Sequence, residues 1–469
     1  MAAAGAGTIG WRAHTEAAAG LVDQLRRIPL GQPVRLAKKT SNLFRTRDDT
    51  HHPGLDVSRL NGVIDVDPVA RTADVQGMTT YESLCAATLP HGLMPYVVPQ
   101  LRTITLGGAV TGLGIESSSF RNGLPHESVL EMDILTGAGE IVTATPDGEH
   151  SDLFHAFPNS YGSLGYSVRL KIALDPIEPY VHLRHVRFDR LAALVDVLGS
   201  VVADREHDGQ RVDFVDGVVF SGEESYLVLG SFTRHAPYTS DYTGQQIFYR
   251  SIQQRTEDYL STLDYIWRWD TDWFWCNRAL GLQNPRVRRL VPRRYLRSDV
   301  YSKVIRFETR HGVMAGIDAR RGKPARERVV QDVELPLGRT QEFLEWFLRE
   351  VPIEPIWLCP MRLRDVPEAT TGEGRPWPLY PMRSGETYVN VGFWSTVAIA
   401  DGARDGDVNR EIERVVHALD GHKSLYSDAY YEPEQFWAMY GGTTYEVVKK
   451  AYDPDGRLPD LYTKAVKRR

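Results

Sequence analysis

Residues 103–124, TITLGGAVTGLGIESSSFRNGL, combine many glycines with short hydroxyl side chains. Glycines at this density form neither an ordinary helix nor an ordinary strand, because each loses backbone entropy on folding and adds no packing. They allow main-chain N–H groups to approach a flat, phosphorylated ligand closely. The alternative is a buried glycine-rich turn between two core elements. The residues concerned are Gly107, Gly108, Gly112, Gly114 and Gly123, followed by the serines at 117–119.

A second group of candidate ligand-binding residues follows the short strand expected at 34–37. Lys38, Thr40, Ser41 and Asn42 offer cationic, hydroxyl and amide groups suited to a pyrophosphate, and the alternative is a solvated basic turn. The histidine pair at 51–52 could bind a metal ion, but an exposed loop is the favoured interpretation, so we expect no metal site.

Composition narrows the classes of protein that this chain could represent. The 469 residues suggest two domains or more. Lys and Arg total 55 against 61 Asp and Glu, a net charge of −6, which argues against a nucleic-acid partner. Three widely spaced cysteines suit a reducing compartment and form neither a zinc site nor a disulfide framework. No signal pattern or long apolar run is evident, so a cytoplasmic location is expected.

The chain begins with residues that we expect to form a flexible tail, 1–13. The run GAGTIG at 5–10 matches the G-x-G-x-x-G pattern, but no strand precedes it and no βαβ unit follows. It therefore fails as a dinucleotide fingerprint. Beyond it, apolar periodicity and turn residues predict the following elements: a helix over 14–28, a hairpin over 55–75, a helix opened by a Thr79–Glu82 capping box and ended by Gly92, a hairpin over 129–144, a short helix over 152–157 and a strand over 167–174.

Six motifs in this order resemble the FAD-binding domain of the PCMH type, found in the vanillyl-alcohol-oxidase superfamily. They are VSRLN at 57–61, VDP at 66–68, GLMP at 92–95, TLGG at 105–108, DLF at 152–154 and SYGSLG at 160–165. The resemblance implies an α+β fold with an FAD-binding domain over 14–179. Because AKKTS at 37–41 replaces the usual glycine-rich phosphate loop and its histidine, we expect FAD to be bound non-covalently.

The resemblance also implies which residues contact FAD. They are Lys38, Thr40, Ser41, Asn42, Thr105, Gly107, Gly108, Gly112, Gly114, Ile115, Glu116, Ser117, Ser118, His126, Ser160, Gly162 and Gly165.

A narrower resemblance, to the Diminuto/Dwarf group of Δ24-sterol reductases, covers most of the chain. It is carried by GIESSS at 114–119, by Gly123 and His126, and by PIWLCP, LYSDAYY and EQFW further on. It implies reduction of an isolated C=C bond on a lipid with FAD and NADPH. Without the N-terminal anchor of the sterol enzymes, the sequence is more similar to the bacterial reductases of tuberculostearic acid synthesis. These convert a 10-methylene acyl chain into a 10-methyl chain beside a partner methyltransferase.

The second half is expected to form a substrate-binding cap over 180–420, an antiparallel sheet covered by helices, and a segment over 421–469 that returns to the flavin domain. Aromatic residues and arginines concentrate at 265–300, where we expect docking to an anionic membrane, at its inner face, as a peripheral protein. The alternative is a core aromatic cluster beside a solvated basic helix. The residues expected at the membrane are Trp267, Trp273, Trp275, Arg288, Arg289, Arg293 and Arg294.

An isolated alkene accepts hydride poorly because no carbonyl takes up the developing charge, so one carbon must be protonated by a desolvated acid. Glu116 is the first candidate for this acid, and the alternative is that it hydrogen-bonds FAD. Asp428, Tyr430 and Tyr431 are the next candidates. Two other functions stay open: an FAD-dependent alcohol or alditol oxidase, and a flavin-bound accessory subunit of a lipid methyltransferase.

Overall fold

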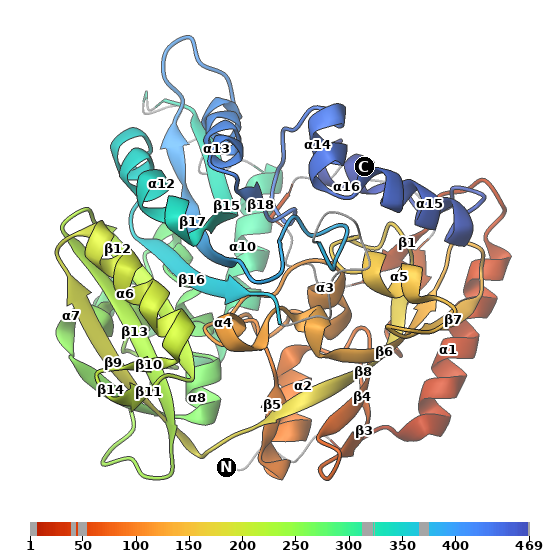
Figure 1. Cartoon of the computed structure of the whole chain (residues 1–469), viewed down its shortest axis with the longest axis horizontal. Coiled ribbons are helices and arrows are strands. Elements are labelled where there is room, and N and C mark those ends of the chain that lie inside the picture. The colour runs from red at the N-terminus through yellow and green to blue at the C-terminus, as the bar shows by residue number, and fades with distance from the viewer. Residues whose placement is uncertain are drawn as a thin grey trace.

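The computed structural model describes residues 7–38, 44–45, 54–311, 322, 324–364 and 375–467, with backbone alone for 306–311. Two antiparallel sheets organise the chain, one in the N-terminal third and one in the remainder (Figure 1). Helices from the C-terminal end lie beside the N-terminal sheet, so the two ends of the chain share one domain.

The N-terminal sheet has the strand order β3-β4-β8-β6-β7, and β5 pairs with the far end of β8. Its long central strand buries Leu170 and Ile172, which are two positions apart and therefore lie on the same face of the sheet. The strands are β3 (Val63–Asp67), β4 (Thr72–Gln76), β5 (Leu93–Pro95), β6 (Val129–Leu135), β7 (Ile141–Ala144) and β8 (Tyr166–Pro176). A separate parallel pair joins β1 (Arg35–Ala37) to β2 (Gly54–Asp56).

Short helices surround this sheet and connect its strands. They are α1 (Gly10–Arg27), α2 (Tyr81–Thr88), η1 (Leu89–His91), α3 (Leu106–Thr111), α4 (Ser119–Asn122), η2 (Pro125–Ser128) and α5 (Ser151–Ala156). Two expectations at helix starts were wrong. The first helix begins at Gly10, inside the expected tail, because the apolar face of α1 packs on β2 and β3. Thr80 rather than Thr79 caps α2, since its hydroxyl accepts the Ser83 N–H.

The second sheet has the order β14-β9-β13-β12-β16-β17-β15-β18, antiparallel throughout. Its strands are β9 (Tyr180–Phe188), β12 (Phe214–Ser221), β13 (Glu224–Thr233), β14 (Glu257–Ser261), β15 (Arg326–Pro336), β16 (Ile356–Arg362), β17 (Thr387–Ala398) and β18 (His422–Lys423). Three helices cover one face: α6 (Leu191–Asp204), α12 (Leu337–Glu350) and α13 (Asp407–Ala418). The other face packs toward the N-terminal domain. The small hairpin of β10 (Glu206–His207) and β11 (Gln210–Arg211) follows α6.

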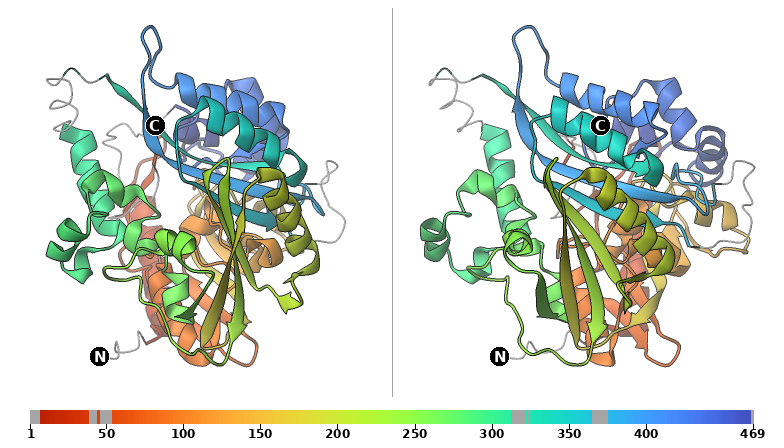
Figure 2. Two further views of the ribbon diagram at one scale, coloured as in Figure 1. Left: turned by 90° about the vertical axis from the view of Figure 1, so that its left-hand side faces the viewer. Right: turned by 60° about the vertical axis from the view of Figure 1, so that its left-hand side comes forward.

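A lobe of short helices protrudes beside the second sheet, at the left of both views in Figure 2. It contains α7 (Phe248–Gln254), α8 (Thr262–Ile266), η3 (Asp270–Asp272), η4 (Cys276–Leu280), α9 (Pro285–Leu290), η5 (Arg293–Tyr295) and α10 (Ser298–His311).

The C-terminal helices return to the N-terminal domain. They are α14 (Pro433–Met439), α15 (Gly442–Tyr452) and α16 (Leu461–Ala465). The Lys449 ammonium group donates to the Ser163 carbonyl at 2.7 Å, and the Val34 N–H donates to the Arg457 carbonyl at 2.8 Å. The strand β18 pairs with β15, so the second sheet extends past residue 420, the boundary expected for the cap.

Candidate active site

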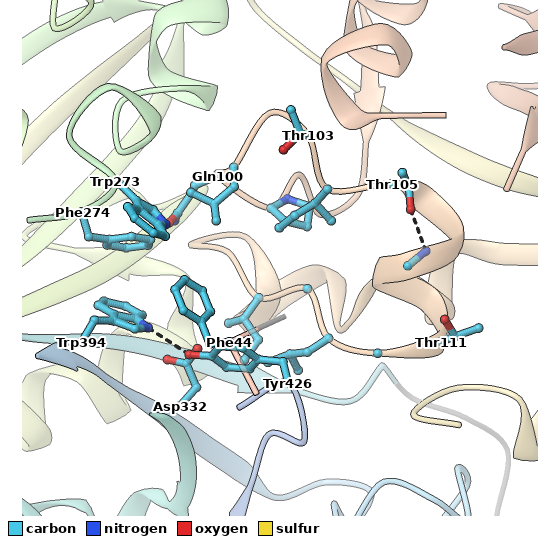
Figure 3. Close-up of a pocket in the computed structure, with 18 of the residues that line it drawn as sticks. Phe44, Gln100, Thr103, Thr105, Thr111, Trp273, Phe274, Asp332, Trp394 and Tyr426 are labelled. Atoms are coloured by element: carbon cyan, nitrogen blue, oxygen red, sulfur yellow. Dashed lines mark hydrogen bonds between the residues drawn. The ribbon is translucent and has the colours of Figure 1, made fainter. Parts of the chain in front are cut away.

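A cavity of about 210 Å³ lies between the glycine-rich stretch and the inner face of the second sheet. Thr105 and Thr111 of the α3 region lie on one side of it, and Asp332, Trp394 and Tyr426 lie on the other (Figure 3). Its lining residues are Lys38, Phe44, Pro99, Gln100, Leu101, Thr103, Ile104, Thr105, Gly108, Thr111, Gly112, Leu113, Gly114, Ile115, Tyr161, Trp273, Phe274, Cys276, Asp332, Trp357, Trp394 and Tyr426.

The glycines of this stretch have different structural roles. Gly108, which lines the cavity, donates its N–H to the Thr105 hydroxyl at 3.2 Å, so Thr105 caps α3. A Cβ at Gly107 would lie 2.2 Å from the Ser167 hydroxyl, so this glycine allows α3 to pack on β8. A Cβ at Gly114 would lie 2.7 Å from Pro125. Gly107 does not line the cavity and its missing side chain serves packing, so its contact with FAD stays a prediction.

Two buried polar groups at the cavity have no hydrogen-bond partner among the described residues. The Gln100 side-chain amide nitrogen and the Tyr161 hydroxyl make no hydrogen bond within the part of the chain that the structure describes. A buried polar group without a partner costs free energy, so both groups favour a polar ligand. Tyr161 has the left-handed φ of 50°, and its N–H donates to the Thr111 carbonyl at 2.6 Å. Together with residues 111–115, which line the cavity, these groups fit a bound FAD.

Several expected FAD contacts lie away from this cavity. Ser118 donates to the Tyr96 carbonyl at 2.8 Å, and His126 stacks on Tyr380 with ring centroids 5.2 Å apart. A Cβ at Gly165 would lie 2.6 Å from the Ile134 side chain, and one at Gly162 would lie 3.0 Å from Tyr166, so both glycines serve packing. Ser160 is buried beside the cavity-lining Tyr161, and its hydroxyl has no partner among the described residues. Thr40, Ser41 and Asn42 lie outside the described residues.

Glu116 does not line the cavity but belongs to a buried charge network. Its carboxylate accepts from Arg268 at 2.9 Å, and the same guanidinium nitrogen reaches Asp216 at 2.9 Å. Ser117 donates to Glu116 at 2.5 Å and lies 2.7 Å from the Tyr265 hydroxyl. Asp216 also accepts from two indole N–H groups, those of Trp269 and Trp357. Glu116 lies outside the cavity and is bound by Arg268 and Ser117, so the geometry does not favour it as the proton donor. Ser117 does not line the cavity either, and its contact with FAD stays a prediction.

The C-terminal candidates for the proton donor also lie elsewhere. Asp428 forms an ion pair with Arg328, and Tyr430 packs against the Arg410 guanidinium at 4.7 Å. Tyr431 is buried against Phe436 and Tyr440. None of these three candidates lines the cavity.

The ionisable groups that do line the cavity opposite α3 are Asp332 of β15 and Tyr426. Burial raises the pKa of Asp332 to about 6, and hydrogen bonds from Asn390 and Tyr426 oppose that rise. The Asn390 amide donates to Asp332 at 3.1 Å, and the Trp394 indole donates to the Tyr426 hydroxyl at 2.9 Å (Figure 3). Burial also raises the pKa of Tyr426 well above its ordinary value. Asp332 therefore carries a proton at mildly acidic pH while it faces an aromatic cavity.

Sequence reasoning missed Asp332 because it alternates with apolar residues. Val333 and Leu335 pack under the helices of the second sheet, so the opposite positions, Asp332 and Glu334, fit the pattern of a solvated strand face. Both acidic residues are in fact buried. The one feature of the sequence that could have indicated Asp332 is the pair of acidic residues in a strand long enough to lie in the middle of a sheet.

The tryptophans expected at a membrane are buried. Trp267, Trp273 and Trp275 pack within the aromatic core between the lobe and the second sheet, and Trp273 lines the cavity. Arg288 is also buried, in an ion pair with Asp272. These four residues were therefore wrongly expected to face lipid headgroups. The other arginines expected there, Arg289, Arg293 and Arg294, are exposed.

Residues 28–145 match the family model of the FAD binding domain. The chain therefore carries an FAD-binding domain, and the expected α+β fold with a PCMH-type FAD domain is confirmed.

Curated relatives extend the similarity to most of the chain. The chain is 27% identical over 458 residues to the Delta(24)-sterol reductase of Arabidopsis thaliana, covering 89% of this chain and 77% of the relative. It is 27% identical over 422 residues to the Delta(24)-sterol reductase of Homo sapiens, covering 87% and 77%. Cytokinin dehydrogenase 7 of Oryza sativa subsp. japonica is 32% identical over 146 residues, covering 31% of this chain and 28% of the relative. Beyond the flavin domain, the chain is thus similar to the Delta(24)-sterol reductases.

The described residues contain neither a membrane-spanning helix nor a metal-binding cluster. No described helix has the length and apolar character needed to cross a bilayer. No cluster of three or more histidine, cysteine or acidic side chains suited to a metal ion occurs among those residues.

Proposed function

We propose that this protein is an FAD-dependent reductase of an isolated C=C bond on a lipid. The observation that carries the proposal is the position of Asp332, a buried carboxyl with a raised pKa, across the cavity from the glycine-rich wall. The similarity to Delta(24)-sterol reductases over nearly the whole chain supports the reaction class.

Bound FAD, once reduced, would supply a hydride to one alkene carbon. Asp332 holds the proton that the other carbon requires, so that one proton and one hydride add across the double bond. Asn390 and Tyr426 fix the carboxyl by hydrogen bonds. Because the Asp332 pKa is about 6, roughly a tenth of the carboxyl is protonated at pH 7.

The cavity walls suit an apolar substrate and exclude water from the reacting atoms. Phe44 stacks on Trp273 with centroids 5.4 Å apart, and Phe274 lies 4.4 Å from Trp394. With Trp357, these rings form an aromatic wall beside Asp332. Such a wall lowers the local dielectric, which disfavours the charged carboxylate and keeps the proton on Asp332 until the alkene takes it up.

We further propose that NADPH is the reductant, that the substrate is a 10-methylene acyl chain on a phospholipid and that the product is the 10-methyl chain. A methyltransferase partner would supply the methylene branch. The sequence resemblance motivates these finer assignments, and the aromatic cavity is compatible with an acyl chain.

The test uses purified protein reconstituted with FAD and supplied anaerobically with NADPH. Vesicles containing a 10-methylene phospholipid are added, and the saturated branch is measured by mass spectrometry. We expect flavin bleaching by NADPH and formation of the 10-methyl chain. Bleaching by alditols with peroxide release in air, and no lipid product, would instead indicate an oxidase.

The location that we propose for the protein is the inner face of the membrane, reached through a docking surface on the helical lobe. This surface consists of exposed apolar residues surrounded by cationic ones. Leu290 is 82% exposed, Val304 47%, Tyr295 44% and Val287 39%. The cationic residues are Arg286, Arg289, Arg293, Arg294 and Lys303.

The lobe connects this docking surface to the cavity. Trp273 and Cys276 line the cavity and pack in a small apolar cluster with Leu282, Leu296 and Tyr301 of the lobe. Arginines near an anionic surface contribute roughly 1 kcal/mol each, and the exposed apolar side chains can enter the headgroup layer. In a protein of net charge −6, such a cationic surface is complementary to anionic lipid.

A further inference from the structure

A second cleft, of about 740 Å³, opens between the N-terminal domain and the second sheet. We name it the arginine cleft after Arg121, Arg205, Arg362 and Arg364, which all line it. The segment of residues 112–127 separates it from the cavity of the candidate active site, which we call the flavin cavity. Residues 112–115 line the flavin cavity, whereas His126 and Glu127 line the cleft.

Two of the four guanidinium groups are held in position by the protein. Arg121 pairs with Asp175 at 2.7 Å and donates to the Asp213 carbonyl at 2.8 Å. The Arg364 guanidinium lies over the Tyr96 ring at 4.8 Å and donates to the Glu127 carbonyl at 3.4 Å. These contacts fix cationic groups at the cleft wall before any ligand arrives.

The other two guanidinium groups have no hydrogen-bond or ion-pair partner among the described residues. Neither Arg205, at the end of α6, nor Arg362, at the end of β16, makes a side-chain hydrogen bond or ion pair with the residues that the structure describes. The acidic residues of the cleft do not neutralise them, because Asp175 is paired with Arg121. Glu127 accepts the Leu124 and Arg364 N–H groups, and burial raises its pKa to about 7.

An independent observation at the same cleft is an orphaned histidine nitrogen. His126 is 1% exposed, and its Nε2 has no hydrogen-bond partner within the described part of the chain. Burial lowers its pKa to about 3, so the ring is neutral and Nε2 can donate or accept one hydrogen bond. A ligand oxygen in the cleft would satisfy it.

We propose that the arginine cleft binds the phosphate group of a phosphorylated ligand. Guanidinium groups bind phosphate oxygens in pairs, and a ligand carrying negative charge compensates the two unpartnered arginines. Two sources share this chemistry: the phosphates of a nucleotide reductant and the headgroup of a phospholipid substrate. The choice between them rests on the proposed function, whereas binding of phosphate does not.

The cleft is also connected to the flavin cavity. The His126 ring stacks on Tyr380, whose hydroxyl donates to the Gly112 carbonyl at 2.9 Å, and Gly112 lines the flavin cavity. Binding at one site can therefore alter the backbone at the other through two side chains.

The experiment is anaerobic calorimetric titration of the FAD-loaded protein, with the flavin reduced beforehand by dithionite and without lipid substrate, so that neither hydride transfer from NADPH nor turnover occurs. The probes are pyrophosphate, glycerol 3-phosphate, NADPH and NADH, the last pair differing by the 2′-phosphate. The variants are Arg362→Gln and Arg205→Asn, the latter because asparagine tolerates the left-handed φ of 55° at this position. Arg289→Gln, an exposed arginine outside the cleft, is the matched control.

We expect pyrophosphate to bind the wild type and the control alike, and both cleft variants at least tenfold more weakly. A preference for NADPH over NADH that disappears in Arg362→Gln would assign the cleft to the nucleotide. Equal binding of glycerol 3-phosphate and NADPH would assign it to the headgroup. Absence of pyrophosphate binding at millimolar concentration, or unchanged affinity in both variants, would overturn the proposal. Binding through Arg362 without any lipid reduction would contradict the proposed function alone.

Discussion

Gly392 of β17 lies directly opposite Asp332 of β15, and a Cβ at this glycine would lie 2.4 Å from the Asp332 carboxyl oxygen and 2.7 Å from Trp394. The missing side chain is therefore what gives the carboxyl and the indole room beside each other. The flavin cavity depends on this one position as much as on the glycine-rich stretch across from it.

Gly392→Ala is expected to displace the Asp332 carboxyl, because the other group that the added Cβ would meet is the rigid Trp394 ring. Overpacking of a buried site typically costs about 1–3 kcal/mol of unfolding free energy. We expect that loss in chemical denaturation and a larger fractional loss of reductase activity. Gly338→Ala in α12 is the control, because its Cβ would meet nothing within 4 Å. Equal effects of the two substitutions would contradict this role of Gly392.

Asp332→Asn keeps the shape of the side chain but removes the proton. Loss of a general acid costs about 10²- to 10⁴-fold in rate, so kcat should fall by that factor while FAD is retained. Wild-type activity should fall as pH rises through about 6, the pKa of Asp332. A variant that keeps both the wild-type rate and the wild-type pH profile would exclude Asp332 as the donor.

The same carboxyl makes stability depend on pH. The folded-state pKa of about 6 exceeds the ordinary value of 3.8, so folding is favoured while Asp332 is protonated. Its contribution is fully present below pH 4 and is lost as pH rises through 6, by roughly 3 kcal/mol. Denaturation of wild type and Asp332→Asn between pH 4 and 7 should show this difference. A constant difference across that range would contradict it.

Glu116→Gln separates a structural from a catalytic role for Glu116. The substitution leaves Arg268 with one buried carboxylate instead of two, so we expect lower stability. At a temperature where the variant is folded, we expect it to retain far more activity than Asp332→Asn. Loss of activity equal to that of Asp332→Asn, with unchanged stability, would instead favour Glu116 as the acid.

Two neighbouring glycines should respond differently to alanine. Gly107→Ala is expected to lower stability, because its Cβ would lie 2.2 Å from Ser167. Gly108→Ala is expected to weaken FAD binding more than folding, because Gly108 lines the cavity and its Cβ would meet only Thr105. Flavin absorbance after gel filtration, compared with the thermal midpoint of the FAD-free protein, distinguishes the two effects. Equal flavin loss in both variants would contradict the assignment.

The docking surface predicts binding to anionic but not to neutral vesicles, weakened by salt. Arg289→Gln/Arg294→Gln removes two arginines, about 2 kcal/mol in all, so the partition coefficient should fall roughly 30-fold. Leu290→Asp should also reduce binding, and Arg26→Gln, at an exposed arginine of α1 outside both the docking surface and the arginine cleft, serves as the control. Sedimentation with vesicles measures each. Unchanged partitioning of both surface variants would exclude the lobe as the contact.

The fold was predictable where one periodicity dominates. The hairpin around Asp67-Pro68 and the strand–helix pair β15–α12 are close to expectation, since apolar spacing and turn residues agree there. The glycine-rich wall of the cavity was also predictable as a candidate site, because glycines and hydroxyls occur in one continuous segment.

The burial of Asp332 and of the three tryptophans could not be predicted from apolar periodicity. Asp332 and Glu334 have the spacing of a solvated face, and only the packing of a second domain buries that face. Trp267, Trp273 and Trp275 fit a membrane surface as well as a core, and only contacts with distant segments decide between the two. Trp275 packs on Trp394 of β17, Trp273 stacks on Phe44, and the Arg102 guanidinium lies over Trp267. Periodicity reports which residues share a face, not what covers it.

The carbonyl of Tyr426 accepts the N–H groups of Phe44 and Arg45, at 3.0 and 3.2 Å, while its hydroxyl accepts from Trp394 of the second sheet. This residue ties an early segment, the second sheet and the C-terminal return together at one point. During synthesis, the pocket therefore closes only after residues as far as Tyr426 have emerged from the ribosome, and neither domain made separately would contain the complete cavity.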